Sequence, residues 1–279
     1  MLELKQPLPA GRTYDSVLRH FEVERSIAER LKAATRAGRK AIYETMYDEL
    51  WAQVPDHPRL TRREDPLETR RRIERLLPLV QCLVRPSSVY LEFAPGDCRF
   101  AFEVARHVAQ AYGVEISDQT GPSARFPANF RLVIYDGYDL DLPDESVDVV
   151  YSDQLIEHLH PEDTELHFRL VRRLLRPGGR YLFRTPHRHS GPHDVSQFFS
   201  DEPQGFHLKE WTYGELTRLL SAVGYRSVSG CFWAGGRRLI RLPRLVFAGC
   251  ETISGRLPRV WARRLDRGFP RGITMIARK

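Results

Sequence analysis

The sequence predicts an α/β fold built around a mostly parallel sheet and preceded by a helical segment. Between residues 88 and 185, short runs rich in β-branched and aromatic residues alternate with segments of helical periodicity. Neighbouring parallel strands need a crossover, usually a helix, so this alternation is typical of parallel sheets. The first 85 residues show helical spacing without the alternation. We therefore expect a helical N-terminal cap over 1–85 and an α/β domain over 86–279.

The cap is predicted from apolar residues that recur every fourth position. Over 14–54 they mark one face of a helix, namely Ile42, Met46, Leu50 and Val54. The stretch PDHP at 55–58 interrupts the pattern, and a further helix is expected over 66–83. Because an apolar helix face must be covered, we expect the cap to pack on, or cover, the domain that follows.

The elements of the domain follow in order along the chain. The predicted strands up to residue 185 are SVYLEF, GVEIS, RLVIYD, VDVVYS and RYLFRT, with the helices FAFEVARHVAQAY and DTELHFRLVRRLL among them. After a histidine-rich loop to about 211 we expect a helix that stops at Gly224, then the strand YRSVSGCFW, two short helices around 243–268 and a final strand GITMIAR. Ligands of parallel sheets bind at the carboxyl ends of the strands, so site residues are sought there.

Composition is that of a soluble globular protein. The chain has 279 residues, of which 42% are hydrophobic and 28% charged, and no apolar run approaches the roughly 18–20 residues of a membrane span. The start, MLELKQPLPAGRTYD, lacks the apolar core of a signal peptide, so a cytoplasmic location is expected. The four cysteines form no CxxC pair, which argues against a disulfide framework or a cysteine zinc site.

Positive charge is concentrated near the C-terminus. The net charge is +7, and residues 226–279 hold 13 Lys and Arg against two acids. We expect this segment, with a basic insertion at about 236–270, to attract an anionic acceptor or to touch an anionic membrane surface peripherally. A solvated basic surface without a partner is the alternative. A nucleic-acid partner is not expected, because the chain shows no recognition module and no aromatic stacking motif.

The stretch LEFAPGDCRF at 91–100 predicts a strand, a tight loop and a helix. Backbone N–H groups at such a helix start bind anionic or polar parts of a cofactor, and glycine allows close approach because it has no Cβ. A dinucleotide fingerprint requires G-x-G-x-x-G, whereas only Gly96 is present here. The loop therefore predicts a cofactor site, but not a dinucleotide site.

Several landmarks over 88–185 resemble the class I S-adenosylmethionine-dependent methyltransferases of the type 11, ubiquinone-biosynthesis-like kind. They are the loop at 91–100, the acids that end the next two strands, LDLPDESVDVVYSDQLIEHLHP, and LLRPGGRYLF. The resemblance implies a Rossmann-like, seven-stranded, mostly parallel sheet of order 3-2-1-4-5-7-6 with helices on both faces. It also implies S-adenosyl-L-methionine as the cofactor.

The same resemblance implies which residues hold the cofactor. Glu92 takes the acidic place of the loop motif, and Ala94 and Cys98 stand where further glycines are common. Glu115 is expected to accept the hydrogen bonds of the ribose diol, and Asp136 to face the adenine amino group. The full implied set is Glu92, Ala94, Gly96, Glu115, Ile116, Asp136, Gly137, Tyr138, Ser152, Asp153 and Gln154.

Methyl transfer requires an aligned acceptor and, for a hydroxyl, a group that takes its proton. Histidine is a natural base near neutral pH, and His158, His193 and His207 follow the fourth and fifth strands. We predict these three as catalytic residues. The predicted reaction is O-methylation of a small molecule or of a saccharide or glycan intermediate. For each histidine, a hydrogen-bonded loop residue is the alternative.

The segments QLIEHL and FHLKEWT are similar to an E-x-x-E-H … H arrangement with which some methyltransferases of this class bind a divalent ion. Gln154 replaces the first Glu, and Glu157, His158 and His207 remain as the residues that would hold a metal. The lost carboxylate argues against a metal, so none is predicted as part of the site. Two other functions stay open: an RNA methyltransferase with a metal-assisted site, and a non-catalytic scaffold with a decayed cofactor loop.

Overall fold

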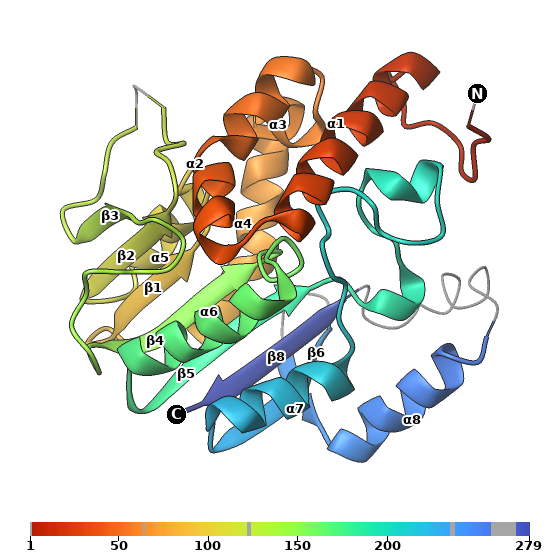
Figure 1. The fold of residues 1–279 in the computed structure, drawn as a ribbon. Helices are drawn as coiled ribbons and strands as arrows, with labels where there is room; N and C mark the ends of the chain where they lie inside the picture. The colour runs from red at the N-terminus through yellow and green to blue at the C-terminus, as the bar shows by residue number, and fades with distance from the viewer. Residues whose placement is uncertain (1, 64, 122–123, 235–237, 258–271) are drawn as a thin grey trace.

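The structure is a computed structural model that describes residues 2–63, 65–121, 124–234, 238–257 and 272–279. Its centre is an eight-stranded sheet of order β3-β2-β1-β4-β5-β8-β6-β7 (Figure 1). Five strands run parallel to one another: β1 (Val89–Phe93), β2 (Gln110–Glu115), β3 (Phe130–Ile134), β4 (Val147–Asp153) and β5 (Leu175–Thr185). The antiparallel neighbours β8 (Ile273–Arg278), β6 (Ser227–Ala234) and β7 (Arg238–Leu242) complete the sheet.

The predicted kind of fold is confirmed, with one strand more than expected. β8 lies between β5 and β6, which is the place that the expected order gives to the seventh strand. The additional strand is β7, which lies in the insertion expected at about 236–270. This five-residue segment, RLIRL, pairs with β6 at the edge of the sheet. One expected helix follows as α8 (Arg244–Ser254), whereas residues 258–268 lie outside the described residues.

Helices cover both faces of the sheet (Figure 1). One face packs against α6 and α7, in a core that includes Leu91 and Phe93 of β1. The other face packs against α4 and α5, in a core that includes Tyr90. Successive strand residues point to opposite faces, so the apolar run of β1 supplies both cores. The bounds of these helices are Pro66–Gln81 (α4), Arg99–Ala105 (α5), Pro161–Leu174 (α6) and Tyr213–Val223 (α7).

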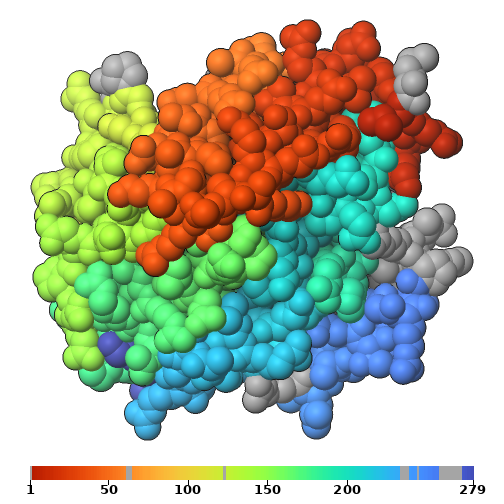
Figure 2. All heavy atoms as spheres, in the orientation of Figure 1, coloured from red at the N-terminus to blue at the C-terminus, as the bar shows by residue number. Residues whose placement is uncertain are grey.

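The N-terminal helices lie across the carboxyl ends of the parallel strands (Figures 1 and 2). α1 (Tyr14–Ala33) and α2 (Arg36–Gln53) pack against each other, and α3 (Pro58–Arg63) leads into α4. Met46 and Leu50, on the face that the periodicity predicts, are buried against Phe206 and Leu208 of the loop after β5. Because α4 packs on the sheet, only the first three helices form a cover over the strand ends.

A long loop with two 3-10 turns connects β5 to α7. The turns are η1 (Arg188–Ser190) and η2 (Val195–Phe198). The carboxylate of Asp194 accepts the backbone N–H groups of Ser196 at 3.0 Å, Gly205 at 3.0 Å and His207 at 3.3 Å. This carboxylate therefore holds both ends of the loop together, and the loop carries two of the predicted catalytic histidines.

A helix that spans a membrane must be long and strongly apolar. Within the described residues, no helix combines the length and the apolar composition that crossing a membrane requires.

Candidate functional site

The loop after β1 curls tightly over residues 94–98. Ala94, Gly96 and Cys98 have φ angles of 54°, 62° and 59°, in the left-handed region that favours glycine. The N–H of Gly96 donates to Oε1 of Glu115 at 2.8 Å, which ties the loop to the end of β2. The loop thus keeps its curled form with a single glycine, at a strain on the order of 1 kcal/mol for each of the other two residues.

Two carboxylates stand at the ends of neighbouring strands. Glu115 ends β2 and is buried. Asp136 follows β3, accepts the backbone N–H groups of Tyr138 and Asp139, and forms an ion pair with Lys40 of α2 at 2.6 Å. Burial opposes ionisation of Asp136, but Lys40 and the two amides outweigh it and lower its pKa to about 2. Asp136 is therefore a carboxylate at neutral pH.

A small cavity lies between these strand ends and α2. Its volume is about 50 Å³, and Ala94, Glu115, Ile116 and Gly137 of the predicted cofactor residues line it. The remaining walls are mostly apolar or aromatic, including Tyr43, Met46, Tyr47, Val114, Tyr135, Leu155 and Leu159. A nucleoside ligand needs a pocket of roughly 300 Å³ or more. The lining suits such a ligand, but the cavity by itself is too small to hold one.

Seven of the eleven predicted cofactor residues do not line this cavity, namely Glu92, Gly96, Asp136, Tyr138, Ser152, Asp153 and Gln154. Glu92 points to the face of the sheet that carries α4 and α5, where it accepts the Tyr90 hydroxyl at 3.0 Å. Burial raises the pKa of Glu92 to about 8. Ser152 is buried with its Oγ 2.7 Å from the Tyr181 hydroxyl. Tyr138 donates its hydroxyl to Asp163 at 2.9 Å, next to the cavity but not among the residues that line it.

A larger cleft opens beside the cavity. It encloses about 800 Å³ between the N-terminal helices, the ends of β4 and β5, and the loop at 193–207. Tyr47, Arg59 and His158 line both the cavity and the cleft. A ligand in the cavity and a ligand in the cleft would therefore meet at these residues. The cleft also contains Asp153, Gln154, His193 and His207 from the predicted site.

His158 and His207 both direct Nε2 away from their hydrogen-bond partners. Nδ1 of His158 lies 3.0 Å from the carbonyl oxygen of Phe206, and Nδ1 of His207 lies 2.7 Å from Oε1 of Glu210. A carbonyl or carboxylate oxygen only accepts, so Nδ1 carries the hydrogen in both rings. Burial lowers the pKa of His158 to about 3. For His207 burial acts in the same direction, but Glu210 and other acids outweigh it and raise the pKa to about 9.

Glu157 completes a group with these histidines. It is fully buried, and its Oε2 accepts the Thr185 hydroxyl at 2.9 Å. Its Oε1 has no hydrogen-bond partner within the described part of the chain. Burial raises the pKa of Glu157 to about 7. One ligand atom from each of Glu157, His158 and His207 lies within 4.8 Å of the other two, which is the donor set of a two-histidine, one-carboxylate cation site.

Glu210 is a buried carboxylate that the sequence analysis missed. Besides His207, it accepts the backbone N–H of His193 at 2.7 Å and lies 3.2 Å from Nδ1 of that ring. Burial opposes ionisation of Glu210, yet His193 and His207 lower its pKa to about 2. Glu210 therefore orients two of the three predicted catalytic histidines. Its spacing three residues after His207 was the signal that could have revealed it.

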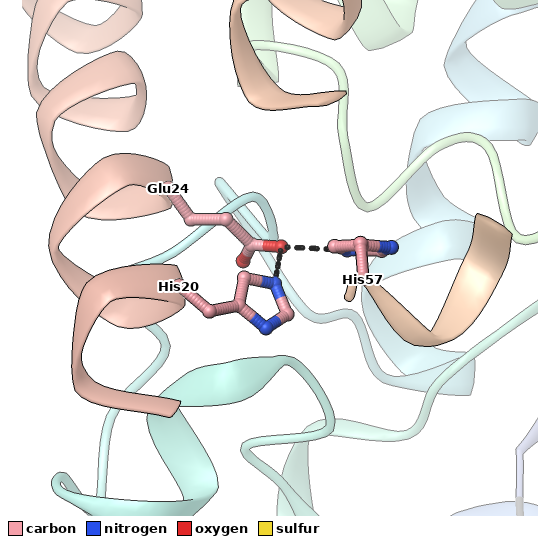
Figure 3. A group of neighbouring side chains, drawn as sticks. All are labelled: His20, Glu24 and His57. Atoms are coloured by element: carbon pink, nitrogen blue, oxygen red, sulfur yellow. Dashed lines mark hydrogen bonds and ion pairs between the residues drawn. The ribbon is translucent and has the colours of Figure 1, made fainter. Parts of the chain in front are cut away.

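A second group of two histidines and one glutamate also lines the cleft (Figure 3). His20 and Glu24 come from α1, and His57 comes from the segment between α2 and α3. Nε2 of His20 is 2.7 Å from Oε1 of Glu24, and Nε2 of His57 is 3.6 Å from the same oxygen. The composition of this group is identical to that of the first.

The ring orientations of the second group are opposite to those of the first. Arg12, which can only donate, lies 3.0 Å from Nδ1 of His20, and the backbone N–H of Arg59 donates to Nδ1 of His57 at 3.0 Å. Both rings therefore carry their hydrogen on Nε2 and direct it toward Glu24. No lone pair of either histidine faces the centre of the group, so it is a hydrogen-bonded clamp rather than a cation site.

The cap contributes site residues that periodicity could not identify. Tyr47 and Arg59 stand at the junction of cavity and cleft, and the guanidinium of Arg59 lies 5.5 Å from the centre of the Tyr47 ring. A helical pattern reveals which face is buried but not which distant strand end it meets. No local signal in the sequence distinguishes these two residues from ordinary members of a solvated helix face.

Residues 91–183 match the family model described as a methyltransferase domain. A protein of Mycolicibacterium smegmatis, named a probable S-adenosylmethionine-dependent methyltransferase, is 42% identical over 143 residues. That match covers 48% of this chain and 51% of the relative. A protein of Mycobacterium tuberculosis with the same description is 39% identical over 105 residues, or 36% of this chain and 35% of the relative. The chain thus spans about half the length, or less, of the curated relatives it matches.

A solved structure agrees on the fold. The S-adenosylmethionine-dependent methyltransferase of Archaeoglobus fulgidus superposes with a TM-score of 0.51 at 19% identity, covering 74% of this chain and 92% of that one. At such low identity the likeness concerns the fold alone. It places the sheet of this chain, with its helices on both faces, in the architecture that the sequence predicts.

Proposed function

Because residues 91–183 match a methyltransferase-domain model and part of the chain is 42% identical to a probable S-adenosylmethionine-dependent methyltransferase, we propose that this chain transfers a methyl group from S-adenosylmethionine to an oxygen of a small molecule or of a saccharide intermediate. The observation that carries the proposal is the shared wall of Tyr47, Arg59 and His158 between the cavity and the cleft. Transfer of a methyl group needs donor and acceptor in line and in contact. Two adjoining pockets with a common wall meet that need.

In this proposal the cofactor binds where β1, β2 and β3 end. Glu115 accepts the ribose hydroxyls, Asp136 accepts the adenine amino group, and the loop at 94–98 receives the methionine end. The sulfonium supplies the activated methyl group when bound. The chain's own residues orient the two partners and keep water away. Binding requires Asp136 to exchange its partner Lys40 for the nucleobase, so α2 acts as a cover over the site.

The group of Glu157, His158 and His207 is the proposed acceptor side. Glu157 has a pKa near neutrality and an unsatisfied oxygen, which suits a residue that takes a proton from a hydroxyl. The same three residues would hold a divalent cation such as Mn²⁺, Fe²⁺ or Zn²⁺. Their outer atoms are already fixed by Thr185, Phe206 and Glu210, as second-shell partners fix metal ligands. A cation there would lower the pKa of an acceptor hydroxyl.

The cofactor part is tested by calorimetry with S-adenosylhomocysteine. Glu115→Ala should weaken binding at least tenfold, because the ribose loses a charged acceptor. Asp118→Ala is the matched control, since the exposed Asp118 bonds only to Thr120 and should leave the affinity unchanged. If the wild-type chain fails to bind S-adenosylhomocysteine, the non-catalytic scaffold is the better description.

The acceptor part is tested with S-adenosylmethionine labelled in its methyl group. We expect label in the small-molecule or glycan fraction of a cell extract, released by conditions that cleave methyl ethers or esters. Label that enters RNA and is removed by ribonuclease would favour the RNA methyltransferase instead. Repeating the assay with EDTA, and with Mn²⁺ added back, reports whether the transfer depends on a cation.

A further inference from the structure

We propose that the cleft recognises an acceptor through an anionic group, a phosphate or a carboxylate, held by Arg59, Arg72 and Arg75. The inference rests on the proposed function and adds the chemical class of the acceptor. It also assigns the attraction for an anion to a different part of the chain from the one that the sequence predicts. The sequence places the basic surface in the C-terminal segment, whereas these three arginines come from α3 and α4.

The cleft carries more cationic than anionic side chains. Six arginines and four carboxylates line it. The carboxylates are Glu24, Glu68, Asp153 and Asp194, and each already has partners. Glu24 accepts from His20 and from the Phe206 N–H, and Asp194 accepts three backbone N–H groups. Glu68 pairs with Arg71 at 2.6 Å. The carboxylates therefore leave an excess of guanidinium groups.

Asp153 is the only one of these carboxylates that faces several arginines. It pairs with Arg72 at 3.1 Å and with Arg184 at 2.9 Å. Burial opposes its ionisation, but Arg184, Arg72 and Arg75 together lower the pKa of Asp153. One negative charge thus stands among three positive charges at the end of β4. A second anion at this position would be attracted rather than repelled.

In the part of the chain that the structure describes, neither Arg59 nor Arg75 forms a close ion pair with a carboxylate, although Arg75 acts on Asp153 from a longer distance. Arg59 is half-buried at the junction with the cofactor cavity, beside the Tyr47 ring. Arg75 lies one turn beyond Arg72 on α4 and lines the same cleft. A guanidinium group offers two parallel N–H donors that match phosphate or carboxylate oxygens. These two residues are therefore available to bind a ligand.

The cofactor's own carboxylate is the rival source of the anion. Arg59 and Arg72 also line a shallow pocket with Ala94, Gly96 and Asp97 of the cofactor loop, but Arg75 does not. Arg75 is thus the residue that separates the two cases. An anion on the acceptor needs Arg75, whereas the methionine carboxylate of the cofactor needs only the arginines next to the loop.

The experiment is calorimetry with pyrophosphate and, separately, with citrate, on chain saturated with S-adenosylhomocysteine in buffer of about 0.15 M ionic strength. We expect at least one probe to bind the saturated wild-type chain. Arg75→Gln should weaken that binding about tenfold or more. Arg70→Gln is the matched control, because Arg70 lies on the same helix, pairs with Glu74 and does not line the cleft. It should change the affinity less than twofold.

Several outcomes overturn the proposal. If neither probe binds once the cofactor site is filled, or if the probes compete with S-adenosylhomocysteine, the arginines serve the cofactor. Competition with the cofactor is checked with 5′-methylthioadenosine, which lacks the methionine carboxylate. If the arginines serve that carboxylate, Arg59→Gln and wild type should bind 5′-methylthioadenosine equally. Equal losses in Arg75→Gln and Arg70→Gln would indicate general charge attraction. A chain that fails to bind S-adenosylhomocysteine refutes the proposed function instead, and that result is read from the cofactor titration alone.

Discussion

Two groups in this protein have the same composition and contribute residues to the same cleft, yet differ in what they can do. Each contains two histidines and one glutamate within 4.8 Å. In the group of His20, Glu24 and His57, the outer nitrogens receive hydrogen bonds, so the inner nitrogens must donate. In the group of Glu157, His158 and His207, the outer nitrogens donate. The inner nitrogen of the neutral His158 keeps its lone pair, whereas His207, whose pKa is raised to about 9, releases its inner proton when it binds a cation. The partners behind the rings therefore determine the chemistry in front of them.

The glutamates of the two groups also differ, because their pKa values are shifted in opposite directions. Glu24 is buried, but contacts with His20 and His57 and the backbone N–H of Phe206 lower its pKa well below the usual range. Glu157 is equally buried but has one oxygen without a partner, and its pKa rises to about 7. The first carboxylate is satisfied and structural. The ionised form of the second is destabilised by burial, and such shifted pKa values are often found at functional sites.

The largest expected effect is on cation binding. His207→Ala should lower the affinity for Mn²⁺ or Zn²⁺ about 100-fold or more, because it removes one of three ligands. His57→Ala should leave the affinity within about threefold, since His57 offers no lone pair. Isothermal titration and metal analysis of the purified chain measure both. If His57→Ala loses the ion while His207→Ala keeps it, the cation site has been assigned to the wrong group.

The second effect is on methyl transfer. Glu157→Gln should reduce the rate about 100-fold, because the amide can neither take a proton nor bind a cation well. Glu24→Gln keeps the shape of the clamp and should stay within a few-fold of wild type. Initial rates at saturating S-adenosylmethionine give the answer. Wild-type activity in Glu157→Gln would exclude that residue from the acceptor side.

The third effect is on stability. Here the change in the group of His20, Glu24 and His57 should matter more than the change in the group of Glu157, His158 and His207. Glu24→Ala should lower the free energy of unfolding by about 2–4 kcal/mol, because it leaves buried donors on His20 and Phe206 without an acceptor. Glu157→Gln should cost little or stabilise the fold, since it removes a buried acidic group with an unsatisfied oxygen. Urea unfolding of both variants tests this. Equal losses would mean that both glutamates are structural.

The fourth effect is gradual in pH and concerns Glu92, a further buried glutamate that has a single hydroxyl donor. Its folded pKa, about 8, lies above the value of 4.5 that applies to an unperturbed glutamate. The folded state therefore holds a proton that the unfolded state has lost between these values. This contribution is complete below about pH 4.5 and is lost as the pH rises toward 8.

Glu92→Gln should remove this loss. Its stability relative to wild type should rise between pH 5 and pH 8, with a slope of up to about 1 kcal/mol per pH unit. Thermal unfolding across this range measures it. A difference between variant and wild type that stays constant with pH would show that Glu92 is ionised in the folded state.

The parallel sheet could be predicted from the local alternation of strands and helices, whereas the order of the strands and the cofactor residues were implied by the resemblance to a methyltransferase family. Gly96, Glu115 and Asp136 each follow a recognisable strand, and strand ends meet at one edge of a parallel sheet. The additional strand β7 was missed because its five residues, RLIRL, include two arginines and carry little periodicity. Glu92 is implied by the loop motif, but the alternation of β1 turns its side chain to the opposite face.

The histidines show the limit of such reasoning. Ten are present, and position after a strand singled out His158 and His207 together with His193. The tautomers of the first two depend on Phe206 and Glu210, and those contacts exist only once the loop after β5 has folded around Asp194. Likewise, Arg59 reaches the site because α1 and α2 are buried against that loop.

What the amino-acid sequence determines by itself is therefore everything that depends on period and order: the sheet, its covering helices and the carboxylates at its strand ends. What only the tertiary structure decided is the direction of each side chain and the identity of its neighbour. Hydrogen bonds act over about 3 Å, so a donor brought in from far along the chain fixes which nitrogen of a histidine is free. A pattern in the sequence does not show which residues, distant along the chain, come within that distance of each other.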